Sequence, residues 1–201
     1  IALPLGMPTA RFPIEQMYHG SRIEPKGFSS VHHFFLPRAG HALAALWRKA
    51  KAHPDARIRE MLLFFVEQAI WGFSVLNRYS PSHFSQVNRA LTGVYYVAAQ
   101  SSECSPEYNL SGKLDRLIKA FGDYRVRTNN IAVTTGSAAA IPLESGSIDY
   151  IFTDPPFGEN LAYAELNFLV EAWHGVMTDA QLDAIVDRSK ENRSAQKSLD
   201  D

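Results

Sequence analysis

Residues 148–157 read Ile-Asp-Tyr-Ile-Phe-Thr-Asp-Pro-Pro-Phe, an apolar run that ends at an acidic residue, two prolines and a phenylalanine. A nearly continuous apolar run of this length is typical of a strand covered on both faces in a parallel sheet. The stretch 131–135, Ile-Ala-Val-Thr-Thr, predicts a preceding strand, with a loop over 136–147 between the two. A helix is expected over about 162–174, with Gly175 as its stop. This order of elements predicts an α/β fold with two neighbouring parallel strands.

The residues upstream of 131 are mainly helical in pattern. Apolar residues at spacings of three and four predict one helix from Arg38 to His53 and a second from about Asp55 to Asn77. A third helix is expected to start at Ser111 as its N-cap and to end near Gly122. Lys113, Arg116 and Lys119 are expected on its solvent side, as a solvated face or as a phosphate contact.

Two further segments of the upstream part are less regular. Five prolines between Pro4 and Pro37 make residues 1–37 an extended lead-in that wraps another surface. The aromatic and β-branched stretch 93–97 predicts a short strand. The chain thus divides into a lead-in and helical accessory or inserted region, 1–130, and a partial catalytic domain, 131–201.

Charge divides the chain at the same place. Residues 1–130 carry 16 Lys and Arg against 9 Asp and Glu, whereas residues 131–201 carry 4 against 12. A basic region of this kind either meets a polyanion such as DNA or simply presents scattered solvated charge.

The composition fits a globular protein without a membrane span. Hydrophobic residues make up 46% and charged residues 20% of the 201 residues, and no apolar run approaches the roughly 20 residues that a span needs. The single Cys104 excludes an internal disulfide, and the first residues lack a signal-peptide pattern, so a cytoplasmic protein is expected. His32 and His33 have no cysteine pair or carboxylate at ligand spacing, so no metal site is expected.

The tetrapeptide Asp154-Pro155-Pro156-Phe157 carries the chemistry. After a parallel strand it lies at the carboxyl end, where ligands bind in open α/β sheets. The Asp154 carboxylate and the Pro155 carbonyl are two acceptors that could bind both hydrogens of an aromatic amine and direct its lone pair at a methyl donor. Phe157 offers a ring face on which an extruded base could stack.

These residues resemble a known family. The stretch from Thr135-Gly136-Ser137-Ala138 through Asp154-Pro155-Pro156-Phe157 to Tyr163 is similar to the middle of an S-adenosylmethionine-dependent DNA amino methyltransferase, of the adenine or cytosine type. The resemblance implies a partial Rossmann-like sheet, with Ser137 and Ala138 near the adenine of the cofactor. It implies a catalytic loop of Asp154, Pro155, Pro156 and Phe157, and Gly158, Asn160 and Tyr163 are the substrate-binding residues that it suggests. Helix capping is an equally good interpretation of Asn160, and packing is an equally good interpretation of Tyr163.

The sequence departs from the family in one respect. The glycine-rich turn that binds the methionine part of the cofactor is missing, since no two glycines here are separated by a single residue. The sequence therefore predicts a fragment that needs the remainder of its parent polypeptide to bind S-adenosylmethionine.

Three functions remain open at this point. The first is methylation of a DNA base in a restriction-modification, phage-defence or epigenetic system. The second is methylation of a guanine amino group in RNA, which Gly158 directly after the motif also suggests. The third is a non-catalytic nucleic-acid-binding or scaffold module.

Overall fold

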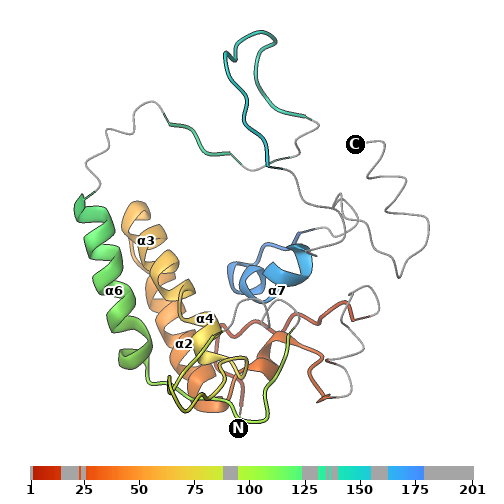
Figure 1. Cartoon of the computed structure of the whole chain (residues 1–201), viewed down its shortest axis with the longest axis vertical. Coiled ribbons are helices and arrows are strands. Elements are labelled where there is room, and N and C mark those ends of the chain that lie inside the picture. The colour runs from red at the N-terminus through yellow and green to blue at the C-terminus, as the bar shows by residue number, and fades with distance from the viewer. Residues whose placement is uncertain are drawn as a thin grey trace.

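The computed structural model describes residues 2–14, 23, 26–87, 95–123, 131–134, 136, 140–154 and 163–178. Helices dominate this part of the chain (Figure 1). They are the 3-10 helix η2 (Val31–Phe34) and the α-helices α2 (Pro37–Lys51), α3 (Ala56–Glu67), α4 (Ile70–Phe73), α6 (Pro106–Asp123) and α7 (Tyr163–His174).

Helices α2 and α3 pack side by side and form the centre of the helical body (Figure 1). α2 has a proline in its first turn. Its last turn contains Arg48, Lys49 and Lys51, and cations at this end are stabilised by the helix dipole. The Asp55 carboxylate caps α3 by accepting a hydrogen bond from the Ile58 amide at 2.9 Å. The expected helix from Arg38 to His53 is therefore confirmed in position.

The expected single helix over 55–77 is interrupted after Glu67. The Ala69 amide donates to the Val66 carbonyl three residues back, which tightens the turn, and the Gln68 carbonyl accepts from the Lys113 ammonium of α6. After α4 the chain becomes extended at Ser74. A hydrogen bond from α6 thus satisfies the Gln68 carbonyl at the break.

Helix α6 starts five residues before the expected N-cap. The Ser105 hydroxyl accepts from the Tyr108 amide at 3.1 Å, and Pro106 follows as the first helical residue. Lys113 does not lie on a solvated face as expected, since its ammonium also bonds the Asn109 side chain at 2.8 Å. Lys113 therefore joins α6 to the α3–α4 turn.

Helix α7 confirms the helix expected over 162–174 within the described residues. Gly175 ends it with a φ of +75°, and the Gly175 amide donates to the Glu171 carbonyl. Leu169 and Trp173 are buried. The Trp173 ring lies 5.5 Å from Trp47 of α2 and 5.7 Å from Phe35.

The lead-in contributes to the same core. Phe12 is buried, and its ring lies 5.3 Å from Phe34 of η2 and 4.4 Å from Phe168 of α7. The buried Tyr95 ring closes this aromatic cluster, 5.0 Å from Phe12, and its hydroxyl donates to the Glu165 carbonyl. Burial raises the pKa of the Tyr95 hydroxyl, so this group stays a neutral donor. The wrapping expected for residues 1–37 is seen at these positions.

The expected partial Rossmann-like sheet is wrong. The described residues contain four isolated β-bridges and no strand. Residues 131–134 and 148–153 have no ladder partner, and Val133, Tyr150 and Phe152 are 90%, 79% and 81% exposed. β-branched and aromatic residues favour extended backbone, but a strand also needs a neighbouring strand and cover for its apolar side chains. No described segment supplies either.

The short strand expected over 93–97 is also not formed in its described part. Tyr95 has a φ of +51°, which no strand residue adopts. The Tyr95 ring lies in the core. Residues 93 and 94 lie outside the described residues.

Candidate functional site

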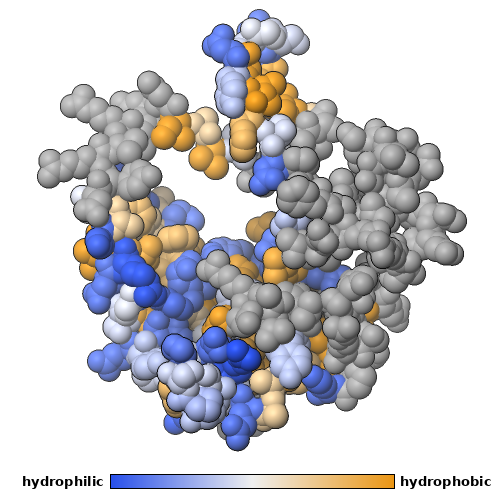
Figure 2. Space-filling view, in the orientation of Figure 1, coloured by the Kyte–Doolittle hydropathy of each residue, from blue (hydrophilic) through white to orange (hydrophobic). Residues whose placement is uncertain are grey.

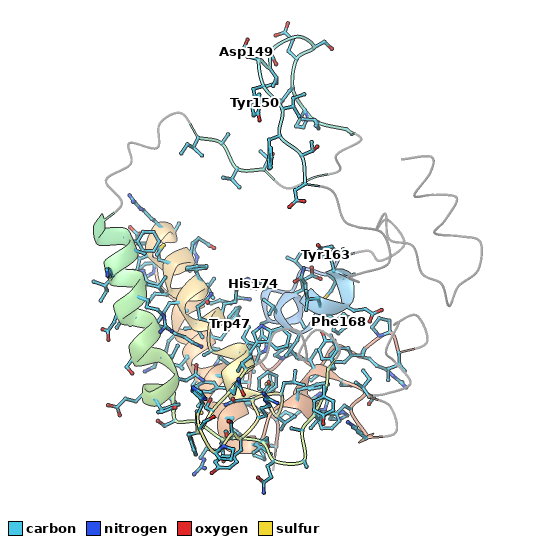
Figure 3. All side chains as sticks on the ribbon, viewed as in Figure 1. Trp47, Asp149, Tyr150, Tyr163, Phe168 and His174 are labelled. Carbon is cyan, nitrogen blue, oxygen red and sulfur yellow. The ribbon has the colours of Figure 1, made fainter. Side chains whose placement is uncertain are left out.

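Asp154 stands at the end of a loop that leaves the helical body. Residues 140–154 extend away from the helices, with Asp149 and Tyr150 near the tip of the loop (Figures 1 and 3). Figure 2 shows hydrophobic side chains on the surface of this loop. Because the described residues form no sheet, Asp154 does not lie at the carboxyl edge of a described strand.

The Asp154 carboxylate is exposed, and no hydrogen bond or ion pair to another described residue engages it. No described residue takes up the lone pairs of its two oxygens, which can accept hydrogen bonds from an incoming donor. The same loop carries Glu144 and Asp149, also exposed, and residues 140–154 contain no lysine or arginine. This local charge favours cationic or amine donors and disfavours phosphate.

The structure brings few of the expected site residues together. Tyr163 is the first residue of α7 and is 39% exposed, and Figure 3 shows it at α7, apart from the tip of the loop. Pro155, Pro156, Phe157, Gly158 and Asn160 lie outside the described residues, as do the expected cofactor residues Ser137 and Ala138. Of the expected site, only Asp154 and Tyr163 have described positions.

A second candidate site, which was not predicted from the sequence, lies on the helical body. A pocket lies between the chain segments that connect α4 to α6, lined by Tyr79, Phe84, Gln100, Ser101, Ser102 and Glu103. The signal in the sequence was two aromatic residues in the polar stretch 79–88, where serine, proline and histidine offer no core to bury them.

Comparison of the chain with known protein families, with curated proteins and with solved structures finds no match. Across the described ranges no cluster of His, Cys, Asp and Glu could hold a metal ion. Of the helices in those ranges, none combines the length and the apolar character needed to cross a bilayer.

Proposed function

We propose that the chain carries the amine-orienting loop of an S-adenosylmethionine-dependent methyltransferase that acts on an exocyclic amino group of a DNA base. The observation that carries the proposal is the sequence Asp154-Pro155-Pro156-Phe157, in which an acidic acceptor precedes two prolines and an aromatic ring. The exposed, uncommitted Asp154 carboxylate supports it, because an acceptor already engaged by the protein could not bind a substrate amine.

In the proposed reaction the Asp154 carboxylate has to orient the substrate amine. The nitrogen lone pair of an aromatic amine is delocalised into the ring, so the amine is a weak nucleophile. Acceptors at Asp154 and at the Pro155 carbonyl would bind the two amino hydrogens and favour a pyramidal nitrogen. Asp154 need not be a strong base, because the nitrogen becomes acidic only as the methyl group arrives.

The methyl group would come from S-adenosylmethionine, whose sulfonium supplies an electrophilic carbon. The described residues on either side of Ser137 and Ala138 form no wall for an adenine ring, since Val133 is 90% and Ile141 62% exposed. These described residues therefore do not fit the adenine of the cofactor as they stand.

The proposed substrate gives the protein a cellular setting. A DNA methylase of this kind would work in the cytoplasm as part of a restriction-modification, phage-defence or epigenetic system. The balance of 16 basic against 9 acidic residues in 1–130 supports DNA as the polyanion that the helical region meets.

The test is transfer of a tritiated methyl group from S-adenosylmethionine to DNA and to RNA, measured with the complete gene product. Asp154→Ala is compared with Asp149→Ala, which removes an exposed carboxylate from the same loop. Loss of one preorganised electrostatic contact lowers the single-turnover rate about 10²- to 10³-fold, so Asp154→Ala should fall by this factor and Asp149→Ala by little.

The outcomes separate the alternatives. Label on RNA alone would replace the DNA assignment with the guanine amino methyltransferase. No label on either nucleic acid would favour the third function, a non-catalytic scaffold module. A normal rate for Asp154→Ala would remove the proposed role of this loop.

A further inference from the structure

The pocket between α4 and α6 has walls of exposed aromatic rings. It is a shallow depression with a volume of about 420 Å³ that is broadly open to solvent. Tyr79 and Phe84, which line it, are 45% and 52% exposed. Tyr108 of α6 continues the row and is 57% exposed.

The rings are arranged edge to face. The Tyr79 and Phe84 ring centres lie 6.4 Å apart at an angle of 82°, and those of Phe84 and Tyr108 lie 5.8 Å apart at 86°. In each edge-to-face pair one ring contributes its edge and the other its face, and the exposure of Tyr79 and Phe84 leaves about half of each side chain accessible to a flat partner.

The backbone beneath the rings holds the pocket in shape. Arg78 forms antiparallel bridges with both Gln86 and Ser101, and the Tyr79 amide donates to the Gln100 carbonyl at 3.0 Å. The Ser102 hydroxyl donates to the Phe84 carbonyl. Three stretches of chain, around 78, 85 and 101, are therefore joined directly.

A buried asparagine connects these stretches to the core. The Asn77 amide nitrogen donates to the Ser102 carbonyl at 3.2 Å, and the Asn77 side-chain oxygen accepts from the Ser85 hydroxyl at 2.9 Å. The Ser102 amide donates to the Asn77 carbonyl at 2.8 Å. Because these groups are bonded within the protein, the pocket is formed before any ligand arrives.

The polar part of the lining suits the edge of a heterocycle. The Gln100 and Ser101 side chains are exposed and can both donate and accept hydrogen bonds. The Glu103 carboxylate is held by Arg38 at 2.7 and 3.0 Å. The Arg38 side chain is 84% exposed, and its Nη1 group makes no hydrogen bond to another described residue.

We infer that this pocket, named here the Phe84 pocket, binds an unpaired base of single-stranded nucleic acid. Flat aromatic walls stack on any base, and amide and hydroxyl groups meet its polar edge. The loops that form the pocket lie at the opposite end of the molecule from the 140–154 loop (Figure 1). The Phe84 pocket is therefore a second nucleic-acid contact, distinct from the proposed methylation loop.

Charge around the Phe84 pocket points to stacking as the main source of affinity. Arg38 and Glu103 neutralise each other, and Arg78 is bonded to the Gln86 side chain at 2.7 Å. Few phosphates can be neutralised at the pocket itself, so the part of the affinity that Phe84→Ala removes should depend weakly on salt. With one phosphate contact, the affinity for a single strand changes less than about threefold between roughly 50 and 200 mM salt.

The experiment is fluorescence anisotropy with a labelled single-stranded DNA, the RNA of the same sequence, and the DNA duplex, all without S-adenosylmethionine. Phe84→Ala and Tyr79→Ala should each weaken single-strand binding about tenfold, as loss of a stacking ring does, whereas Phe84→Tyr should bind like the native protein. Binding to the duplex should be weaker, because its bases are already stacked.

Phe121→Ala is the matched control. Phe121 is an exposed ring, 55%, on the same helix as Tyr108, and the helical rise places it about 20 Å further along. Equal losses for Phe121→Ala and Phe84→Ala, unchanged binding by Phe84→Ala and Tyr79→Ala, or equal affinity for duplex and single strand would each overturn the inference.

The DNA and RNA arms identify which nucleic acid the pocket prefers. The inference does not rest on the methyltransferase proposal, because no methyl donor is present in the assay and the substituted rings, Tyr79 and Phe84, lie outside the 140–154 loop. Methyl transfer and single-strand binding can therefore fail separately.

Discussion

Asn77 shows how one polar side chain can organise a region without regular secondary structure. It is fully buried, and its amide nitrogen donates to the Gly72 and Ser102 carbonyls, with the Cys104 sulfur at 3.4 Å. A buried polar group is stable only when it is bonded, so each of these partners depends on Asn77.

We predict that Asn77→Ala lowers the free energy of unfolding by about 2–3 kcal/mol, because it leaves two buried carbonyls and the Ser85 hydroxyl without their partner. Urea unfolding followed by circular dichroism measures this. Asn167→Ala, at an exposed position of α7, is the control and should change the value by less than about 0.5 kcal/mol. Equal effects of the two variants would show that Asn77 has no special role.

The ion pair between Arg38 and Glu103 makes a small contribution that depends on pH. The hydrogen bond from Arg38 lowers the pKa of Glu103 below its ordinary value of 4.5. A carboxylate with a lowered pKa stabilises the folded state above its unfolded pKa, and this stabilisation is lost as the pH falls through the folded pKa.

We therefore predict that Glu103→Gln is less stable than the native protein at pH 7, and that the difference shrinks as the pH falls below about 4.5. Thermal unfolding across this pH range is the measurement. A difference that stays constant with pH would mean that packing, and not charge, accounts for the effect of the substitution.

At the scale of elements, the docking of α6 depends on the absence of a side chain. A Cβ atom at Gly72 of α4 would lie 1.9 Å from the Asn109 amide nitrogen of α6. Asn109 in turn bonds Lys113, which reaches the Gln68 carbonyl. The close approach of the two helices therefore places Asn109 and Lys113 in their bonded positions.

We predict that Gly72→Ala destabilises the protein by about 1–3 kcal/mol, because the added methyl group forces Asn109 to move. Gly122→Ala, near the end of α6, meets nothing within 4 Å and should instead stabilise by about 0.5–1 kcal/mol through the unfolded state. Chemical unfolding of both variants decides the matter. If Gly72→Ala is as stable as Gly122→Ala, the close contact does not limit the packing of α6.

The sequence predicted helices far better than strands, for a physical reason. A helix satisfies its backbone hydrogen bonds locally, so apolar spacing was enough to place α2 and α7. The start of α6 was signalled by Ser105 followed by Pro106, and Ser111 was a less specific choice. Residues 131–134 and 148–153 have strand-like composition, but pairing depends on distant residues that composition does not specify.

The candidate site was predicted only in part for the same reason. Asp154 was identified by its local motif, which needs no knowledge of the fold. The Phe84 pocket depends on the pairing of Arg78 with both Gln86 and Ser101, and no local sequence pattern predicts such bridges. The boundary placed between residues 130 and 131 stays a prediction.

At the scale of the whole molecule, α7 is the element that closes the core. Its Leu169 and Trp173 side chains are buried, and the same core contains Phe12, Trp47 and Tyr95. His174 adds a contact at 2.9 Å to the Glu67 carboxylate of α3. In contrast, the loop 140–154 that precedes α7 in the chain contributes no residue to this core.

We predict that chymotrypsin cuts the loop at Tyr150 and Phe152 before it cuts at other described aromatic residues, because these two rings are 79% and 81% exposed and the loop 140–154 extends away from the helices (Figure 1). The two pieces should stay associated on gel filtration, because α7 remains packed through Leu169 and Trp173. Trp173→Ala removes a buried indole, which costs about 3–5 kcal/mol of stability, so its cut form should separate or unfold. Tyr163→Ala, at an exposed position at the other end of α7, is the control, and its two pieces should stay associated after cleavage. Pieces of the native protein that separate at once would show that α7 is held to the core mainly by its covalent connection, and that the aromatic contacts across Trp47 and Phe35 are too weak to close it.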